Sequence, residues 1–195
     1  MKALIFFIFL FLFIPVRSFS GEIISSSIAK EDGAYHIKIE ISVNAGKKKV
    51  MEIFNNPEKL KSLSHLIRES GVVERCNGGA VKKIRVTKIC FYICLQLEQA
   101  KIVETGDDPI VMIIPDQTNF NPAEMRMRIS EGGHGKTIIS CKMDVEPKTM
   151  PRLILSLVSE GKINKKLNAA GTAMIKKIEA MAKKDGLSAL SAGNK

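Results

Sequence analysis

The residues of this sequence that could carry out chemistry are few, and they are widely spaced. Ser130–Thr137 nearly matches the phosphate-loop pattern GxxxxGK followed by Ser or Thr, but a serine takes the place of the first glycine. A phosphate loop also joins a strand to a helix, whereas strands are expected on both sides of this segment. The histidines fall on the polar face of a strand (His36), in a helix (His65) and in a turn (His134), and no GxSxG nucleophile motif occurs. We therefore expect no catalytic residues, although an acid such as Glu124 would support an enzyme if it lay in a cavity.

The cysteines are the next candidates for chemistry: Cys76, Cys90, Cys94 and Cys141. On a continuous strand Cys90 and Cys94 would lie about 13 Å apart, which is too far for a disulfide. A tight bend at residues 91–93 would allow the two to pair, and the alternative is two buried thiols that pack as small apolar side chains. The CxxxC spacing has no second pair and no nearby histidine, so no metal site is expected. Cys141 falls on the apolar face of its strand, where we expect it to be buried.

Residues 1–20 have the form of a secretory signal peptide. Lys2 precedes the apolar run Ala3–Ile14, and Ser18 and Ser20 stand at positions −3 and −1 before a cleavage site at Gly21. The apolar run is shorter than the roughly 20 residues that span a bilayer, although a retained N-terminal anchor is the alternative. We expect a mature protein that is exported to the periplasm or secreted, where disulfides persist.

The composition after this segment is that of one globular domain with a basic surface. The whole chain is 45% hydrophobic and 26% charged, with a formal net charge of +10. Removal of residues 1–20 takes away Lys2 and Arg17 and leaves a charge of +8. Such a charge favours anionic lipid head groups or acidic ligands. Nucleic acid is not expected as a partner, because no basic stripe interleaved with aromatic residues occurs.

The elements that must position any site begin with an alternating strand, Tyr35–Val43. Two short helices follow, Lys47–Asn55 and Pro57–Ile67, and six strands joined by hairpins then occupy Gly71 to Val145. The long amphipathic segment Pro151–Lys184 predicts a C-terminal helix. Its apolar stripe is formed by Leu153, Leu157, Ile163, Leu167, Met174, Ile178 and Met181. This order predicts an α+β domain over residues 34–185, with a lead-in at 21–33 and a flexible tail at 186–195.

This order of elements resembles the helix-grip superfamily, which contains START-like lipid-transfer domains and polyketide cyclases. The resemblance covers roughly Ala34 to Lys184, and it depends on three segments: VMEIFNNPEKL, CNGGAVKKIRV and PRLILSLV. The chain is especially similar to exported bacterial members in which a CxxxC segment interrupts the third and fourth strands. The resemblance implies a seven-stranded curved antiparallel sheet that grips the C-terminal helix over an apolar cavity.

We therefore expect the chain to carry or sequester a hydrophobic, lipid-like small molecule, without a cofactor, between the sheet and the C-terminal helix. Peripheral contact with an anionic membrane is a further expectation. The loop Asp116–Pro122 is the expected lid. The predicted ligand-binding residues are Ile84, Val86, Leu97, Met112, Phe120 as gate, Met125, Met127, Ile139, Met143, Leu153, Leu157, Ile163 and Leu167. The alternatives are a cyclase- or hydrolase-like enzyme of the same superfamily and a protein-interaction module with a filled cavity.

Overall fold

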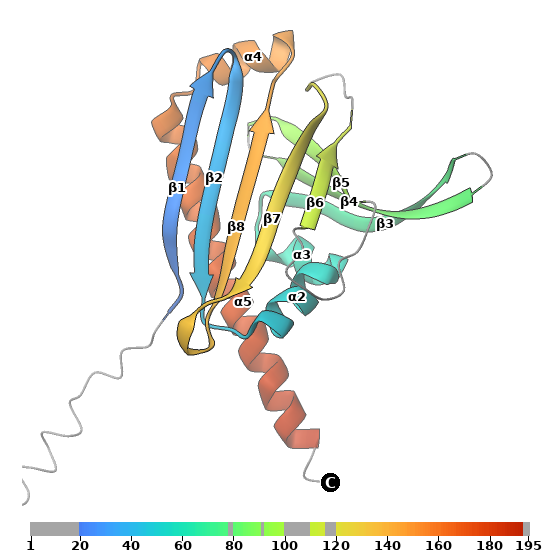
Figure 1. Ribbon diagram of the computed structural model, residues 1–195, viewed down its shortest axis with the longest axis vertical. Helices are drawn as coiled ribbons and strands as arrows, with labels where there is room; N and C mark the ends of the chain where they lie inside the picture. Colours follow the sequence, from blue (N-terminus) through green and yellow to red (C-terminus); the bar gives the residue numbers. More distant parts are fainter. Residues whose placement is uncertain (1–19, 78–79, 91, 100–109, 116–119, 193–195) are drawn as a thin grey trace, which may run out of the picture.

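The chain folds into one curved antiparallel sheet and four α-helices in the part that the structure, a computed structural model, describes: residues 20–77, 80–90, 92–99, 110–115 and 120–192 (Figure 1). The strands are β1 (Glu22–Glu31), β2 (Ala34–Val43), β3 (Ile67–Asn77), β4 (Ala80–Cys90), β5 (Cys94–Gln99), β6 (Ile110–Ile114), β7 (Ala123–Glu131) and β8 (Thr137–Val145). The helices are α2 (Lys47–Asn55), α3 (Pro57–Leu63), α4 (Thr149–Ser156) and α5 (Glu160–Ala192), with a 3-10 turn at Gly133–Gly135.

The strands are ordered β1-β2-β8-β7-β6-β5-β4-β3, and every neighbouring pair is antiparallel. Figure 1 shows α5 behind β1, β2 and β8, while β3 and β4 run at a steep angle to these strands. A single helix is narrower than a sheet that curves in this way. Space therefore remains between the inner face of the sheet and α5.

The sheet has eight strands rather than the predicted seven, because β1 occupies most of the segment expected to be a lead-in. Its sequence, EIISSSIAKE, alternates poorly, and a register shift between Ile23 and Ser25 leaves Ile24 47% exposed. The hairpin to β2 turns at Asp32 and Gly33, whose φ angles are +48° and +84°. Asp-Gly is a strong hairpin signal, since both positions of such a turn require positive φ.

The predicted C-terminal helix is two helices, because the chain breaks between α4 and α5 at residues 157–159. The Ser159 side chain accepts a hydrogen bond from the Lys162 amide at 3.4 Å and so begins α5. The six-residue interval between Leu157 and Ile163 in the predicted stripe marks this break. At its other end α5 continues to Ala192, through residues that we expected to form a flexible tail.

The short helices cover one end of the sheet. The first has its predicted bounds, whereas α3 ends at Leu63 rather than at Ile67, which is the first residue of β3. In α2 the buried side chains include Val50, Ile53 and Phe54. In α3 they are Leu60 and Leu63. The Asn56 side chain accepts a hydrogen bond from the Lys59 amide at 3.1 Å and caps α3, which begins with a proline. Both helices join the core that also contains Ile178 of α5.

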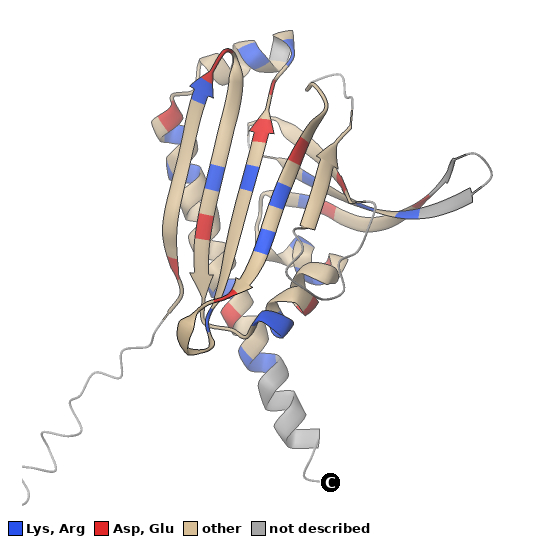
Figure 2. Cartoon of the chain, in the orientation of Figure 1, with Lys and Arg blue, Asp and Glu red and all other residues tan. Residues whose placement is uncertain are grey.

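The outer face of the sheet is charged, as Figure 2 shows for β2, β7 and β8. Lys38, Lys142 and Arg126 occupy one row across these three strands, because Lys142 is opposite both of the others. In the neighbouring row His36 Nδ1 lies 2.7 Å from an Asp144 carboxylate oxygen. On β2, β7 and β8 the polar side of the strand therefore faces away from α5, and the apolar side faces the interior.

Among the described residues, no helix combines the length and the apolar character needed to cross a membrane. The predicted signal peptide lies outside these residues, except for Ser20.

Candidate functional site

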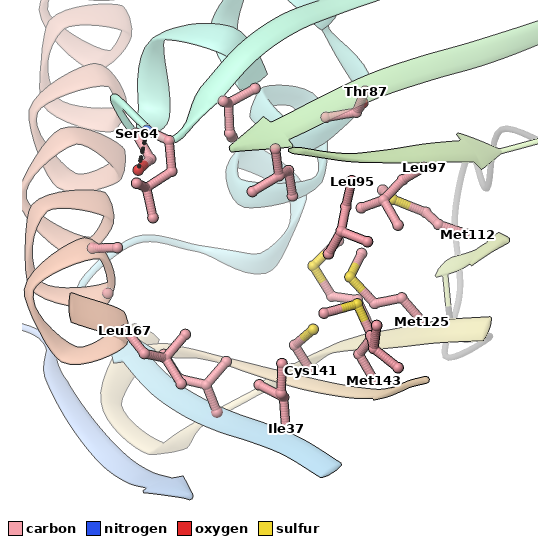
Figure 3. Close-up of a pocket in the computed structure, with 18 of the residues that line it drawn as sticks. Ile37, Ser64, Thr87, Leu95, Leu97, Met112, Met125, Cys141, Met143 and Leu167 are labelled. Carbon is pink, nitrogen blue, oxygen red and sulfur yellow. Dashed lines mark hydrogen bonds between the residues drawn. The ribbon is translucent and has the colours of Figure 1, made fainter. Parts of the chain in front are cut away.

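A cavity of about 280 Å³ lies between the inner face of the sheet and α5. Its lining is almost entirely carbon and sulphur. Figure 3 shows side chains from the β2–β8 half of the sheet on one side and from β4 and β5 on the other, with Leu167 of α5 at the edge. Five methionines take part, and their flexible thioethers can adapt to guests of different shape. These are Met112, Met125, Met127, Met143 and Met174.

Most of the predicted ligand-binding residues line this cavity. Every second residue of a strand points to the inner face of the sheet. Most of the predicted strand residues therefore point into the cavity, and α5 supplies the opposite wall. The predicted residues that line it are Leu97, Met112, Phe120, Met125, Met127, Ile139, Met143, Ile163 and Leu167.

The predicted inward residues of β4 are wrong by one position. Arg85 and Thr87 are buried at 3% exposure each, whereas Ile84 and Val86 are half-buried and do not line the cavity. The guanidinium of Arg85 donates to the Phe54 carbonyl at 2.7 Å and to the Asn55 carbonyl, and so satisfies acceptors in the last turn of α2. These bonds fix the orientation of β4, and burial lowers the pKa of Arg85.

The prediction of Leu153 and Leu157 as lining residues is also wrong. Leu153 is 58% exposed and Leu157 is 85% exposed. The break before α5 ends the helical periodicity on which that prediction relied, so that Leu157 leaves the stripe. Leu155 of α4 lines the cavity in their place.

Sequence reasoning assigned no part of β2 to the site, but this strand contributes Tyr35, Ile37, Ile39 and Ile41. The sequence contained the information needed to include them, because these residues form the apolar side of the alternating strand Tyr35–Val43. Gly171 of α5 faces them, and a Cβ atom at this position would lie 3.1 Å from Ile39 Cδ1. The close approach of α5 to β2 therefore closes the cavity on that side.

Few polar side chains line the cavity. The Ser64 hydroxyl accepts a hydrogen bond from the Leu66 amide at 3.2 Å (Figure 3). Thr87 has a buried hydroxyl oxygen that makes no hydrogen bond with the described residues. Cys141 is a free thiol in the cavity wall, and desolvation raises its pKa to about 11. Burial also raises the pKa of Tyr35, with a smaller contribution from the carboxylate of Glu160.

Among the described residues, the ionisable side chains that line the cavity are Tyr35, Tyr92 and Cys141, and no Asp, Glu, His, Lys or Arg side chain lines it. Glu124, the acid that sequence analysis kept as a candidate, is exposed on the outer face of β7 and forms an ion pair with Arg126. His134 lies in the turn between β7 and β8 and has a φ of +59°. The segment that resembled a phosphate loop is thus a hairpin between two strands. No group of three or more metal-ligating side chains occurs in the described part of the chain.

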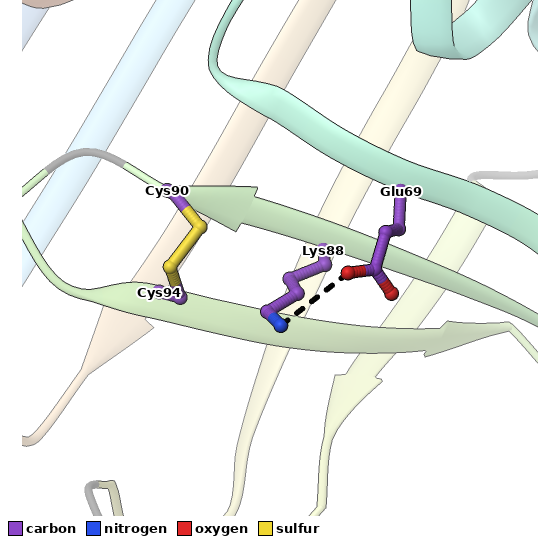
Figure 4. The surroundings of a disulfide bond; sticks show 4 residues. All are labelled: Glu69, Lys88, Cys90 and Cys94. Carbon is purple, nitrogen blue, oxygen red and sulfur yellow. Dashed lines mark hydrogen bonds and ion pairs between the residues drawn. A yellow bond between two sulfur atoms is a disulfide. The ribbon is translucent and has the colours of Figure 1, made fainter.

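A disulfide joins Cys90 at the end of β4 to Cys94 at the start of β5, with 4.0 Å between the Cα atoms (Figure 4). The two residues are opposite each other in the ladder, because the chain turns back between them. Tyr92 and Ile93 of this turn line the cavity. Lys166 Nζ lies 3.9 Å from the centre of the Tyr92 ring, so the turn also contacts α5.

The predicted lid is only partly described, because residues 116–119 lie outside the described residues. Phe120 is 2% exposed and forms a β-bridge with Pro147, just before α4. Its ring lines the cavity. The role of Phe120 as a gate stays a prediction.

Comparisons with known proteins identify the fold. No protein-family model matches the sequence, and no curated protein matches it. Solved structures do match, with low identity. A START superfamily protein from Mycobacterium smegmatis is 16% identical, with a TM-score of 0.53 over 76% of this chain and 97% of that one. The Zhui aromatase/cyclase from a Streptomyces species is 8% identical, with a TM-score of 0.55 over 77% and 94%. Major latex-like protein 151 from Panax ginseng is 10% identical, with a TM-score of 0.50 over 76% and 97%.

These similarities extend over nearly the whole of each matched chain, and they concern the arrangement of the backbone. The chain has the START-like helix-grip fold, with an eight-stranded antiparallel sheet and a long C-terminal helix.

Proposed function

We propose that this START-like chain is an exported protein that binds a hydrophobic, lipid-like molecule in the cavity between the sheet and α5. The observation that carries the proposal is the apolar lining of a cavity of about 280 Å³. Burial of a ligand's apolar surface there contributes about 25 cal/mol per Å². A charged group would be costly at the same place.

The chemistry of the lining favours a hydrocarbon chain or ring system over a charged metabolite. The structures with this fold include one named an aromatase/cyclase, and a catalytic role here would need an acid or base beside the ligand. Glu124 is on the outer face instead. The cavity also argues against the alternative of a protein-interaction module, because in such a module the protein's own side chains would fill this space.

The first test is native mass spectrometry of the processed protein recovered from the exported fraction, followed by extraction of bound lipid. We expect a co-purifying apolar species. Cys141→Trp places a large ring in the cavity wall and should remove this species. Ser140→Trp is the matched control, because Ser140 is the neighbouring outward residue of β8. An empty wild-type protein that also takes up no fatty acid, quinone or sterol would refute the proposal.

We further propose that the tip formed by α4 and the break before α5 contacts anionic membranes. Leu153, Ile154 and Leu157 are 58%, 46% and 85% exposed there. Residues 148–166 contain five basic side chains and one acid, Glu160. Exposed apolar groups among basic ones suit the surface of an anionic bilayer. Leu155, in the same helix, lines the cavity, which would place the membrane beside a route for the ligand.

Vesicle flotation tests this contact. We expect binding to phosphatidylglycerol vesicles, weaker binding to phosphatidylcholine vesicles, and a loss of binding for Leu157→Ser. Ile113→Ser is the control, because Ile113 is 45% exposed but lies on β6, in the middle of the sheet. Equal flotation of the two variants would exclude this tip as the docking site.

A further inference from the structure

The backbone nitrogen of Gly21 lies 2.6 Å from a carboxylate oxygen of Glu179 on α5. The Asn44 amide, just after β2, donates to the same oxygen at 2.8 Å. One partly buried carboxylate thus holds the residue before β1 and the residue after β2 against α5. Gly21 is also the residue at which the expected cleavage site places the new amino terminus.

The position accepts only glycine. A Cβ atom on Gly21 would overlap the Ser42 carbonyl oxygen and would approach Val43 Cα and Ile175 Cγ2 to 2.8 Å each. Backbone atoms make up two of these three contacts, so a small movement of side chains cannot relieve the overlap. The chain is therefore packed tightly against β2 and α5 from its first residue after the cleavage site, whereas Ser20 is exposed.

Cleavage changes the chemistry of this contact. Water hydrolyses the Ser20–Gly21 peptide bond, which leaves a carboxylate on Ser20 and an amino group on Gly21. That amino group takes up a proton and is largely an ammonium at neutral pH, since an α-amino group has a pKa of about 7.7–8.0. Before cleavage, an uncharged amide N–H of Gly21 donates to the carboxylate of Glu179. After cleavage, the donor at the same place is a cation, so Coulombic attraction between opposite charges is added to the hydrogen bond.

We propose that the amino terminus released before Gly21 forms an ion pair with Glu179, and that this pair locks the start of β1 onto α5 in the processed chain. Removal of the leader then completes the fold as well as releasing the protein. Because the pair lies outside the ligand cavity, the inference is independent of the proposed ligand binding, but it rests on the proposed export, which supplies the cleavage before Gly21.

A double-mutant cycle on the purified protein tests the pair. Its four proteins start at Gly21 or at Ser18, the second being a mimic of the unprocessed chain, and carry Glu179 or the isosteric substitution Glu179→Gln. With Glu179 we expect the chain that starts at Gly21 to have a folded-to-unfolded ratio about tenfold higher in urea titrations, equivalent to about 1.4 kcal/mol. With Glu179→Gln the two starts should have equal stability. Glu131→Gln, an exposed change of the same charge, should keep the tenfold difference.

Two results would overturn the inference. One is an effect of the starting residue that is the same with and without the Glu179→Gln substitution, because the amino group would then act without the carboxylate. The other is an intact mass of the exported protein that places its first residue anywhere but Gly21. A mass that begins at Gly21 together with a non-additive cycle supports it.

Discussion

Cys141 illustrates, at the scale of a single residue, how the cavity alters side-chain chemistry. Its side chain lines the cavity, and desolvation there raises the pKa of its thiol from 9.0 to about 11. The thiolate is the reactive form, and at pH 8 the rise of the pKa to about 11 lowers the thiolate population about 100-fold. We therefore expect iodoacetamide to alkylate Cys141 at pH 8 about 100-fold more slowly in the folded protein than in the unfolded chain, as measured by peptide mass spectrometry.

The unfolded reference is the same protein in urea, so the peptide that contains Cys141 serves as its own control. An equal alkylation rate in both states would mean that water reaches the thiol freely. The raised pKa also makes stability depend on pH. Because burial disfavours the thiolate, the contribution of Cys141 to the free energy of unfolding falls as the pH rises above about 9.

Residue-level prediction from the sequence was most reliable where one face of a strand is uniformly apolar. The inward positions of β7 and β8, such as Met125, Met127 and Ile139, followed from alternation alone. In β4 both faces carry apolar residues, and the orientation depends on Arg85 reaching the end of α2. That contact joins residues about 30 positions apart in sequence, so local alternation could not reveal it.

At the scale of elements, substitutions of two glycines in α5 allow the effect of helix propensity on stability to be measured separately from the effect of packing. Gly161 has no atom within 4 Å of a Cβ placed on it, whereas Gly171 faces Ile39 at 3.1 Å and Ile23 at 3.4 Å. We expect Gly161→Ala to raise the free energy of unfolding by about 0.5 kcal/mol, because alanine favours helix. Gly171→Leu should lower it by about 1–3 kcal/mol through overpacking. Urea titrations measure both, and a neutral Gly171→Leu would show that α5 is not held closely against β1 and β2.

The Cys90–Cys94 disulfide stabilises the turn between β4 and β5, whose residues line the cavity. The closed loop is short, and the loop-entropy relation gives a stabilisation of about 2 kcal/mol. We expect the double variant Cys90→Ser/Cys94→Ser to lose this amount in urea titrations without loss of the fold. Reduction of the wild-type protein should reproduce the loss, and reductant should not affect the double variant. An unchanged midpoint in both experiments would contradict a stabilising disulfide.

The elements themselves were predictable to different degrees. The first short helix was predicted at its observed position, and the second at its observed start but four residues past its observed end at Leu63. Amphipathic spacing is a local signal, which is why both helices could be found. β1 was missed because its three consecutive serines obscure the alternation, and its place in the sheet is set by pairing with β2. The break between α4 and α5 was hidden by the apolar residues that surround it. Leu157 looked like part of a buried stripe, but it is 85% exposed.

At the scale of the whole molecule, an apolar interior is left partly unfilled. Cavities cost roughly 24 cal/mol per Å³ in large-to-small core variants, so an empty space of about 280 Å³ represents several kcal/mol of stability. A cavity between the sheet and the C-terminal helix could be predicted from the order of the elements. The identity of the lining residues required the actual curvature of the sheet, which depends on all eight strands.

A ligand that fills the cavity should therefore stabilise the protein measurably. At a free ligand concentration 100 times the dissociation constant, binding to the folded state alone adds about 2.7 kcal/mol. For a chain of this length, 1 kcal/mol corresponds to about 2–4 °C in the melting temperature. We expect oleic acid or cholesterol, added to delipidated protein, to raise the melting temperature by roughly 5–10 °C in differential scanning calorimetry.

The two tryptophan variants of β8 make this result specific. Cys141→Trp occupies the site and should abolish the shift, while its own melting temperature without ligand stays near that of the wild type or rises. Ser140→Trp adds the same ring to the outer face and should retain the full shift. If both variants respond to ligand as the wild type does, the lipid binds to the surface and the cavity is not the binding site. A shift lost only in Cys141→Trp would assign the stabilisation to the space between the sheet and α5.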